Sequence, residues 1–241
     1  MQHNDSFNDS TFSFVNNIIT PEGGTHLAGF RNALTKTFNS YAREAKILKD
    51  SDAALTGDEK GNFAEIEPVT GAKDNLKWIG IAPFAKHMGK IYPIELQEQV
   101  VAHFATDPKV KVFLFGGGKS EQEVFDGWVA KYPTVVSMIG KLNMRTELNL
   151  MSHLDVMLSM DSANMHLASL VNIPVISVWG ATHPYAGFMG WKQLPVNTVQ
   201  LDLSCRPCSV YGQKPCWRGD YACLREIKPE QVIAKIEGII N

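Results

Sequence analysis

Residues 156–179 decide the fold, and they read Val-Met-Leu-Ser-Met-Asp-Ser-Ala-Asn-Met-His-Leu-Ala-Ser-Leu-Val-Asn-Ile-Pro-Val-Ile-Ser-Val-Trp. The apolar run at 156–159 is short enough for a buried strand, and the residues at 163–171 favour a helix. A second apolar run at 174–179 predicts another strand. Two strands joined by a helix in so short a segment predict a parallel βαβ unit with a right-handed crossover.

The same alternation extends over the chain from residue 76 onward. Further strands are expected at 76–82, 110–115 and 134–137, and further helices at 93–105, 120–131, 145–153 and 229–240. We therefore predict an α/β fold with a Rossmann-like parallel sheet. Open sheets of this kind bind their ligands at the carboxyl ends of the strands.

The strongest candidate site lies where the strand at 156–159 gives way to the helix. Asp161 or Ser162 could cap this helix and leave its first backbone N–H groups free. Several such donors, together with the helix dipole, bind a diphosphate well. The alternative is an ordinary capped helix whose His166 faces the core.

Three other segments follow predicted strands and could reach the same crevice. Residues 86–90 hold Lys86, His87 and Lys90, which suit either an anion clamp or a solvated basic loop. Three glycines at 116–118 let a ligand approach the backbone closely, and Glu121 follows them. The segment after the strand at 174–179 contains Thr182 and His183; the histidine is either a general base or a surface residue.

These motifs, with Trp-Ile-Gly-Ile-Ala-Pro-Phe-Ala-Lys at 78–86, resemble glycosyltransferase family 9, the heptosyltransferase-like enzymes of lipopolysaccharide assembly. The resemblance implies that residues 76–241 are the donor-binding half of a two-domain GT-B enzyme. It assigns to the nucleotide-sugar donor the residues Lys90, Gly117, Gly118, Glu121, Asp161, Ser162, Ala163, His166 and Thr182. Ala163 departs from the family motif, because glycine is frequent at that position.

The resemblance also implies an inverting transfer of a sugar, such as a heptose, to a saccharide or lipid-linked acceptor, with no cofactor required. Such a transfer needs a carboxylate base to activate the acceptor hydroxyl. In the family this base lies in the acceptor half, which we do not expect in this chain. The catalytic residue is therefore unknown, and we expect donor binding without efficient turnover.

The N-terminal segment shows a different pattern of residues. Residues 13–43 read Ser-Phe-Val-Asn-Asn-Ile-Ile-Thr-Pro-Glu-Gly-Gly-Thr-His-Leu-Ala-Gly-Phe-Arg-Asn-Ala-Leu-Thr-Lys-Thr-Phe-Asn-Ser-Tyr-Ala-Arg, and they resemble the transducer domain of the DNA gyrase B subunit. A strand is expected at 11–19 and a helix at 25–48, whose apolar face could mediate self-association. The ATP-binding motifs of that family are not in the chain, so we expect neither ATP hydrolysis nor DNA supercoiling.

The two resemblances divide the chain into a gyrase B-like fragment at 1–58, a polar linker at 59–75 and the glycosyltransferase-like domain at 76–241. The main function expected is nucleotide-sugar binding for glycosyl transfer. The alternatives are a fragment of a type II DNA topoisomerase and a non-functional fusion.

All four cysteines fall between residues 205 and 223. Cys205, Cys208, Cys216 and Cys223 follow a C-x2-C-x7-C-x6-C spacing, which differs from common zinc ribbons. A structural zinc site and free or redox-labile thiols both remain open, since a reducing compartment disfavours disulfides. Cysteine-rich tails occur in some family 9 members, which implies a structural role.

Composition narrows the class of protein. A net charge of −2 gives no basic excess, so we expect no direct binding of nucleic acid. The first residues lack the basic start and apolar core of a signal peptide, and no apolar run approaches membrane-spanning length. We expect a cytoplasmic protein that could act peripherally at the inner membrane.

Overall fold

The computed structural model describes residues 14–15, 18–19 and 60–241. The chain forms two compact units that meet between Asp58 and Glu59. In the first unit, β1 (Phe14–Val15) pairs antiparallel with β2 (Ile18–Ile19), so the single strand expected over 11–19 is wrong. The helix expected at 25–48, and with it the predicted self-association face, lies outside the described residues.

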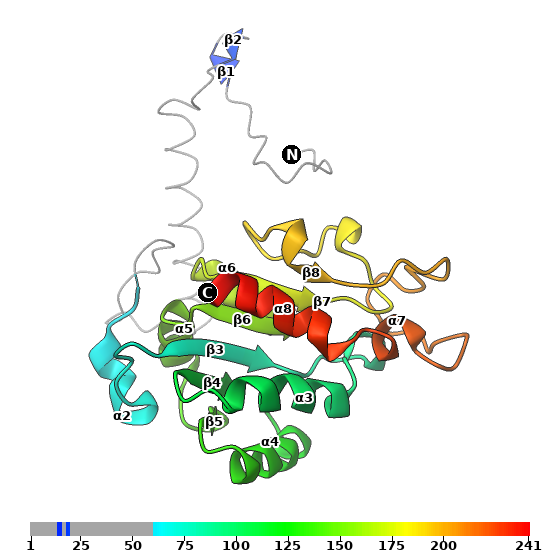
Figure 1. The fold of residues 1–241 in the computed structure, drawn as a ribbon. Coiled ribbons are helices and arrows are strands. Elements are labelled where there is room, and N and C mark those ends of the chain that lie inside the picture. Colours follow the sequence, from blue (N-terminus) through cyan, green and yellow to red (C-terminus); the bar gives the residue numbers. More distant parts are fainter. Residues whose placement is uncertain (1–13, 16–17, 20–59) are drawn as a thin grey trace. The chain divides into compact units, whose positions relative to one another are not determined.

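The second unit is built on a six-stranded parallel sheet in the order β5-β4-β3-β6-β7-β8 (Figure 1). The strands are β3 (Lys77–Ala82), β4 (Val110–Leu114), β5 (Val135–Ser137), β6 (Val156–Met160), β7 (Val175–Val178) and β8 (Thr198–Val199). The strand order reverses between β3 and β6, which is the switch point where open sheets of this type bind ligands. The α/β fold predicted from the sequence is confirmed.

Helices lie between most successive strands, and two more follow β8. They are α3 (Ile94–Ala105), α4 (Lys119–Lys131), α5 (Met144–Ser152), α6 (Ala163–Leu170), α7 (Ala222–Arg225) and α8 (Pro229–Ile240). Helices α3 and α8 contact each other and lie side by side over one face of the sheet (Figure 1). Helix α5 contacts α6. Right-handed crossovers on either side of the switch point place these two helices on the opposite face.

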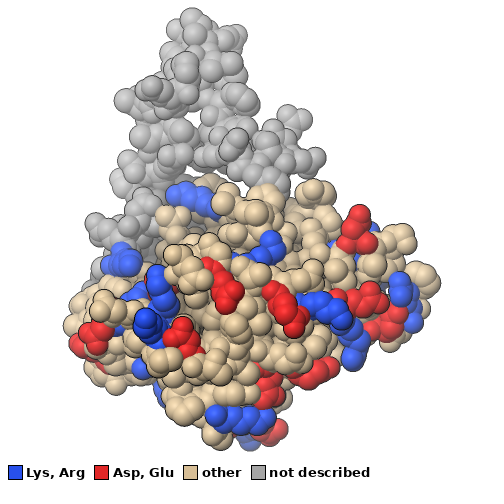
Figure 2. All heavy atoms as spheres, in the orientation of Figure 1, with Lys and Arg blue, Asp and Glu red and all other residues tan. Residues whose placement is uncertain are grey.

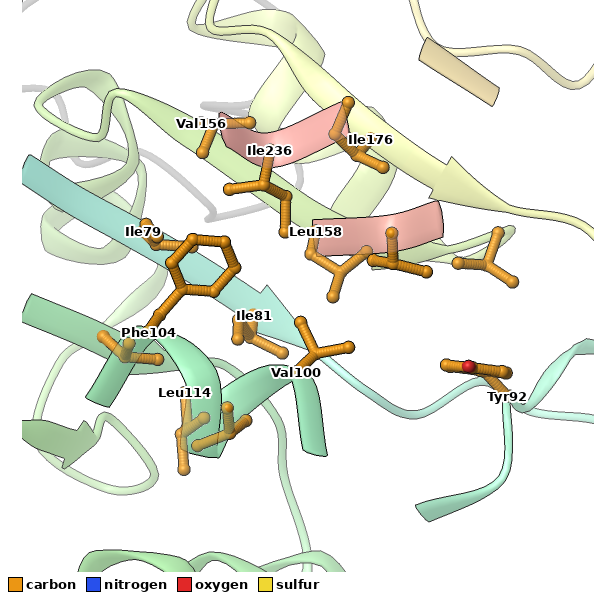
Figure 3. Packing of buried hydrophobic residues seen from close by; sticks show 14 of the residues in the cluster. Ile79, Ile81, Tyr92, Val100, Phe104, Leu114, Val156, Leu158, Ile176 and Ile236 are labelled. Carbon is orange, nitrogen blue, oxygen red and sulfur yellow. The ribbon is translucent and has the colours of Figure 1, made fainter. Parts of the chain in front are cut away.

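The main core lies between the sheet and the α3–α8 layer (Figure 3). Ile79 and Ile81 of β3 point to the same face of the sheet as Leu158 of β6. On this face they share one core cluster with Val100 of α3 and Ile236 of α8, and all five side chains are fully buried. Strands enclosed by helices on both faces carry near-continuous apolar runs. This explains why β3 and β6 could be recognised in the sequence.

Residues 60–75, predicted as part of a linker, contain short helical segments that pack on the domain. They are η1 (Phe63–Glu65) and α2 (Glu67–Thr70), with the fully buried Ile66 between them. Asn149 of α5 donates a hydrogen bond to the Asn62 carbonyl at 2.8 Å. The compact unit therefore begins before residue 76, at Glu59.

The surface carries both signs of charge. Figure 2 shows Lys and Arg interspersed with Asp and Glu over the described part of the face in view, without a broad field of one sign. Extended basic surfaces are the electrostatic footprint of nucleic-acid binding, and the visible face has none. In the part of the chain that the structure describes, none of the helices combines the length and apolarity needed to cross a bilayer.

Candidate functional site

A cleft of about 680 Å³ opens at the carboxyl ends of β3, β4 and β6. Its walls come from the loops that follow these strands, from the start of α6 and from the first turn of α5. The predicted site residues that line it are Lys90, Gly117, Glu121, Asp161, Ser162, Ala163 and His166. Lys86 and His87 line it as well, so the predicted anion loop and the predicted helix start share one cavity.

The N-terminus of α6 opens into this cleft. Ser162 is the N-cap residue, but within residues 60–241 its side chain makes no capping hydrogen bond to the helix. The Ser162 hydroxyl instead lies 3.2 Å from the Ser159 hydroxyl. The expectation that Asp161 or Ser162 caps the helix through its side chain is therefore wrong. The first N–H groups of an uncapped helix remain available to a ligand.

Asp161 is buried behind the helix start and holds Lys90. Its Oδ2 atom lies 2.8 Å from Nζ of Lys90 and accepts a hydrogen bond of 2.8 Å from the Thr182 hydroxyl. Both partners compensate the carboxylate for the loss of water, since Asp161 is only 4% exposed. Lys90 has three N–H donors, so it can serve Asp161 and an anion in the cleft together.

Thr182 is fully buried and does not line the cleft. Its hydroxyl donates to Asp161, so Thr182 supports the cleft from behind and does not face into it. Gly118 also lies outside the cleft lining. It precedes α4 with φ of +90°, a backbone conformation that favours glycine, and so shapes the turn.

Close glycine contacts hold the Lys90 loop in place. Gly89 accepts a hydrogen bond of 2.8 Å from the backbone N–H of Ala181, and a Cβ atom at Gly89 would lie only 2.8 Å from Cβ of Ala181. On the other side, a Cβ atom at Gly212 would lie 2.8 Å from Cγ of Lys90. The cysteine-rich segment therefore packs against the stem of Lys90, a contact with no signal in the sequence.

The glycine loop after β4 is held by Glu121. Oε2 of Glu121 accepts a hydrogen bond of 2.8 Å from the backbone N–H of Gly117. A Cβ atom at Gly116 would lie 2.5 Å from that same oxygen, so only glycine permits this approach. Glu121 thus lines the cleft with one oxygen already engaged by the loop.

His166 is solvent-accessible at the surface of the cleft, yet enough protein surrounds its ring for burial to lower the pKa of the imidazole. Lys90 lowers this pKa further, whereas Asp161 opposes the shift. Because the ordinary histidine pKa is about 6.5, His166 is mainly neutral at pH 7. A neutral imidazole can donate or accept one hydrogen bond but adds no positive charge to the cleft.

Four cleft residues carried no sequence signal that marked them as part of a site. Met144 and Glu147 lie three residues apart in the first turn of α5 and both line the cavity. Phe188 and Tyr211 line another part, with their ring centroids 5.7 Å apart. Tertiary packing alone places Phe188 and Tyr211 together, since they are 23 positions apart in the sequence.

The cysteine segment is fixed mainly by Arg206. Its guanidinium donates to the carbonyls of Gly180, Leu201 and Thr182 and to the side chain of Gln200. All four cysteines are free thiols. Within residues 60–241, no group of three or more Cys, His, Asp or Glu side chains is arranged to hold a metal ion.

Burial raises the pKa of the Cys223 thiol to about 11 and also raises that of Cys208. Reactive cysteines carry the opposite shift, because the thiolate is the nucleophile. Both thiols are therefore protonated at neutral pH, in keeping with a packing role for this segment.

Comparison with known proteins separates the two units. A family model described as DNA gyrase B matches residues 1–60. The gyrase B subunit of Clostridium acetobutylicum is 52% identical over 59 residues, and that of Mycoplasma genitalium is 57% identical over 58 residues. Each match covers 24% of this chain and 9% of the relative, so the chain spans a small part of these subunits.

The second unit has the fold of a glycosyltransferase. Its structural neighbours include a glycosyl transferase of family 9 from Veillonella parvula, with a TM-score of 0.57 and 22% identity. Another neighbour, E. coli ADP-heptose lps heptosyltransferase II, superposes on this chain with a TM-score of 0.59 at 16% sequence identity. The matches cover 73% and 81% of this chain but only 49% and 56% of those chains, about half of each neighbour.

E. coli heptosyltransferase WaaC with ADP-2-deoxy-2-fluoro heptose is a further neighbour, with a TM-score of 0.51 at 16% identity over 82% of this chain and 53% of that one. Together these findings show a chimera. A gyrase B-like segment at the N-terminus precedes a domain with the fold of family 9 heptosyltransferases. The gyrase match ends at residue 60, next to the boundary between the two compact units.

Proposed function

We propose that residues 60–241 bind the diphosphate of a nucleotide-sugar donor, as the donor half of a glycosyltransferase. One observation carries this proposal: the uncapped N-terminus of α6 opens into the cleft, and Lys90 lines the same cavity. Backbone donors, a helix dipole and an ammonium group in one cavity suit a diphosphate. The glycosyltransferase fold of the domain adds the expectation of a nucleotide sugar.

The charges of the cleft support this assignment. Lys86 and Lys90 bring two ammonium groups to the loop after β3, and the Asp161 carboxylate is paired with Lys90 and accepts a hydrogen bond from Thr182. Hydrogen bonds between a charged group and its partner contribute about 1.5–3 kcal/mol each. The diphosphate therefore gains from Lys90 without a free carboxylate opposing it at this position.

Transfer itself would invert the anomeric centre and would use a saccharide acceptor, of the lipopolysaccharide core type or lipid-linked at the inner membrane. It needs a base that removes the proton of the acceptor hydroxyl. Asp161 and Glu121 are poor candidates because each already accepts internal hydrogen bonds. These two carboxylates of the cleft are thus engaged within the domain and are not free to act as this base.

Isothermal titration of the full chain with ADP, GDP, CDP, UDP and their sugar conjugates tests the proposal. We expect binding to at least one nucleoside diphosphate, and Lys90→Met should weaken it by roughly 10- to 100-fold. Lys131→Met is the matched control, because Lys131 pairs with Glu98 on the outer surface, away from the cleft. Failure of the wild-type chain to bind any of these ligands would reject donor binding.

The gyrase match favours a second candidate, a fragment of a type II DNA topoisomerase. It rests on the 52–57% identity of the first 60 residues to gyrase B subunits. A third possibility is a fusion without function. Sequencing of the genomic locus across codons 55–65, with mass spectrometry of a peptide spanning that junction, tests whether cells make the joined chain. A junction absent from the locus would reject a natural fusion.

A further inference from the structure

A fully buried glutamine holds both ends of the basic loop of the cleft. This basic loop, residues 83–92, leads from β3 to α3 and contains Lys86 and Lys90. Gln97 stands in the first turn of α3 and has no exposed surface. Burial of an amide is costly unless hydrogen bonds replace those to water, so the partners of Gln97 show what the residue does.

The hydrogen bonds that the Gln97 amide donates both go to the basic loop. Its Nε2 atom lies 2.9 Å from the carbonyl oxygen of Pro83, the first residue of the loop, and 2.6 Å from that of Tyr92, the last. An amide nitrogen carries two N–H donors, whereas a hydroxyl carries one. An uncharged side chain can therefore bridge two carbonyls in this way only if it ends in an amide. Gln97 ties the start of the loop to its end.

The end of the loop at Tyr92 has two further anchors. The Tyr92 hydroxyl donates to the Ile227 carbonyl at 2.9 Å, and the Tyr92 backbone N–H lies 3.4 Å from Sδ of Met160. Tyr92 is itself fully buried, beyond the carboxyl end of β3 (Figure 3). Lys90, two positions earlier, therefore extends from a fixed base, and its Nζ atom lies 2.8 Å from Oδ2 of Asp161.

The oxygen of the Gln97 amide argues against a role in packing alone. Oε1 of Gln97 is buried and has no hydrogen-bond partner among the residues that the structure describes. An unpaired buried oxygen destabilises a fold, and a methionine of similar volume would fill the space without one. What the amide adds is the bridge between the two ends of the loop. Natural proteins tolerate such local costs mainly at functional sites.

We infer that Gln97 is a positioning residue for the diphosphate site: it fixes both ends of the basic loop and so holds the Lys90 ammonium group where the anion binds. This inference rests on the proposed donor binding. Gln97 does not line the cleft, so it acts through Lys90 and touches no part of the donor. A loop that is ordered before binding loses less conformational entropy when the anion arrives, which raises affinity.

Isothermal titration of the full chain with ADP and with inorganic pyrophosphate tests this role. Gln97→Met keeps the approximate volume and the helix propensity of the side chain but removes the bridge. We expect it to weaken the binding of both ligands roughly tenfold. Both should be affected, because the diphosphate is the group that the two ligands share. Affinities equal to those of the wild type would overturn the role of Gln97.

A double-mutant cycle with Lys90→Met distinguishes positioning from a general loss of structure. If Gln97 acts through the ammonium group, Gln97→Met should change ADP affinity by less than about twofold once residue 90 is no longer lysine. The same loss in both backgrounds would show that Gln97 acts by another route and would refute the inference.

Amide hydrogen exchange reports on the loop without any ligand. In Gln97→Met, a peptide covering residues 84–91 should exchange faster than in the wild type, whereas a peptide covering β6 should be unchanged. Unchanged exchange over residues 84–91 would show that the bridge does not order the loop, which is incompatible with the inference.

Asn149→Leu is the matched control. Asn149 is also a buried amide whose Nδ2 atom donates to a backbone carbonyl, that of Asn62, and whose Oδ1 atom has no partner within residues 60–241. It does not line the cleft. Both variants remove amide hydrogen bonds and should unfold at lower urea concentration, but only Gln97→Met should lose ADP affinity. Equal losses of affinity would reduce the effect of Gln97 to destabilisation.

The outcomes separate this inference from the proposed function. If the wild-type chain binds neither ADP nor pyrophosphate nor another nucleoside diphosphate, the donor site is rejected and the positioning role is rejected with it. If the wild-type chain binds and Lys90→Met weakens binding, but Gln97→Met does not, the donor site stands and the role of Gln97 alone is overturned.

Discussion

Gly212 offers a sharp test of how the cysteine-rich segment supports the cleft. It has φ of +77°, and a Cβ atom there would lie 2.8 Å from Cγ and 3.0 Å from Cε of Lys90. The left-handed backbone costs an L-residue about 1–2 kcal/mol, and forcing Lys90 out of its rotamer adds about 1 kcal/mol. Gly212→Ala should therefore destabilise the domain by roughly 2–3 kcal/mol, measured by urea unfolding.

The same substitution should weaken ADP binding, because it displaces the lysine that faces the diphosphate. Loss of its charge-assisted hydrogen bonds predicts a dissociation constant roughly 10- to 100-fold higher by isothermal titration. Gly219→Ala is the matched control: Gly219 has φ of +79°, but a Cβ atom there would meet nothing within 4 Å. It should carry only the backbone cost of about 1–2 kcal/mol and leave ADP affinity unchanged.

Equal ADP affinities in Gly212→Ala and Gly219→Ala, measured where both are folded, would refute this reasoning. They would show that the contact between Gly212 and the Lys90 stem does not position the ammonium group. Equal unfolding free energies would show in addition that Lys90 adjusts without strain.

Three further predictions concern the partners of the site and the pH response of the fold. Asp161→Asn leaves the nearly buried Lys90 without its counter-charge, so the free energy of unfolding should fall by roughly 1–3 kcal/mol in urea titrations. Asp107→Asn, at an exposed position just after α3, should have little effect. Thr182→Val removes one hydrogen bond behind the cleft and should cost about 1 kcal/mol of stability; a loss of ADP affinity as large as that of Lys90→Met would place Thr182 in contact with the donor instead. Burial lowers the pKa of His153, so near and below pH 6.5 the unfolded chain binds more protons than the folded chain. The contribution of His153 to stability should therefore be complete above pH 6.5 and decline as the pH falls through that value. His153→Gln should reduce this decline in the free energy of unfolding, measured in urea between pH 7.5 and 5.5, and an unchanged slope would contradict the role of His153.

The central strands β3, β4, β6 and β7 could be predicted because they are enclosed on both faces. Ile79 and Ile81 of β3, or Val156 and Leu158 of β6, face the same core, and burial on both sides of the sheet makes the whole strand apolar. The short strand β8 and the helix α7 carry only two and four residues, so neither shows a periodic pattern. Strand β8 forms where the chain pairs with β7.

Part of the candidate site followed from local sequence. The loop with Lys90, the glycines after β4 and the start of α6 each follow a strand, and the carboxyl ends of parallel strands lie along one edge. Their meeting in one cleft was therefore predictable. The direction of the Thr182 hydroxyl was not, because a threonine after a strand can face either a ligand or a buried carboxylate, and only the position of Asp161 decides between them.

The sequence by itself determined the alternation of most strands and helices, the edge of the sheet where the candidate site lies and the seam between the two parts of the chain. These depend on hydrophobic periodicity and short motifs, which are local properties. The tertiary structure alone decided that Gly212 braces Lys90, that Asp161 binds Lys90 and does not cap α6, and that Glu147 lines the cleft. Such contacts join residues far apart in the chain, and their energies depend on distances and burial that exist only once the sheet has brought those residues together.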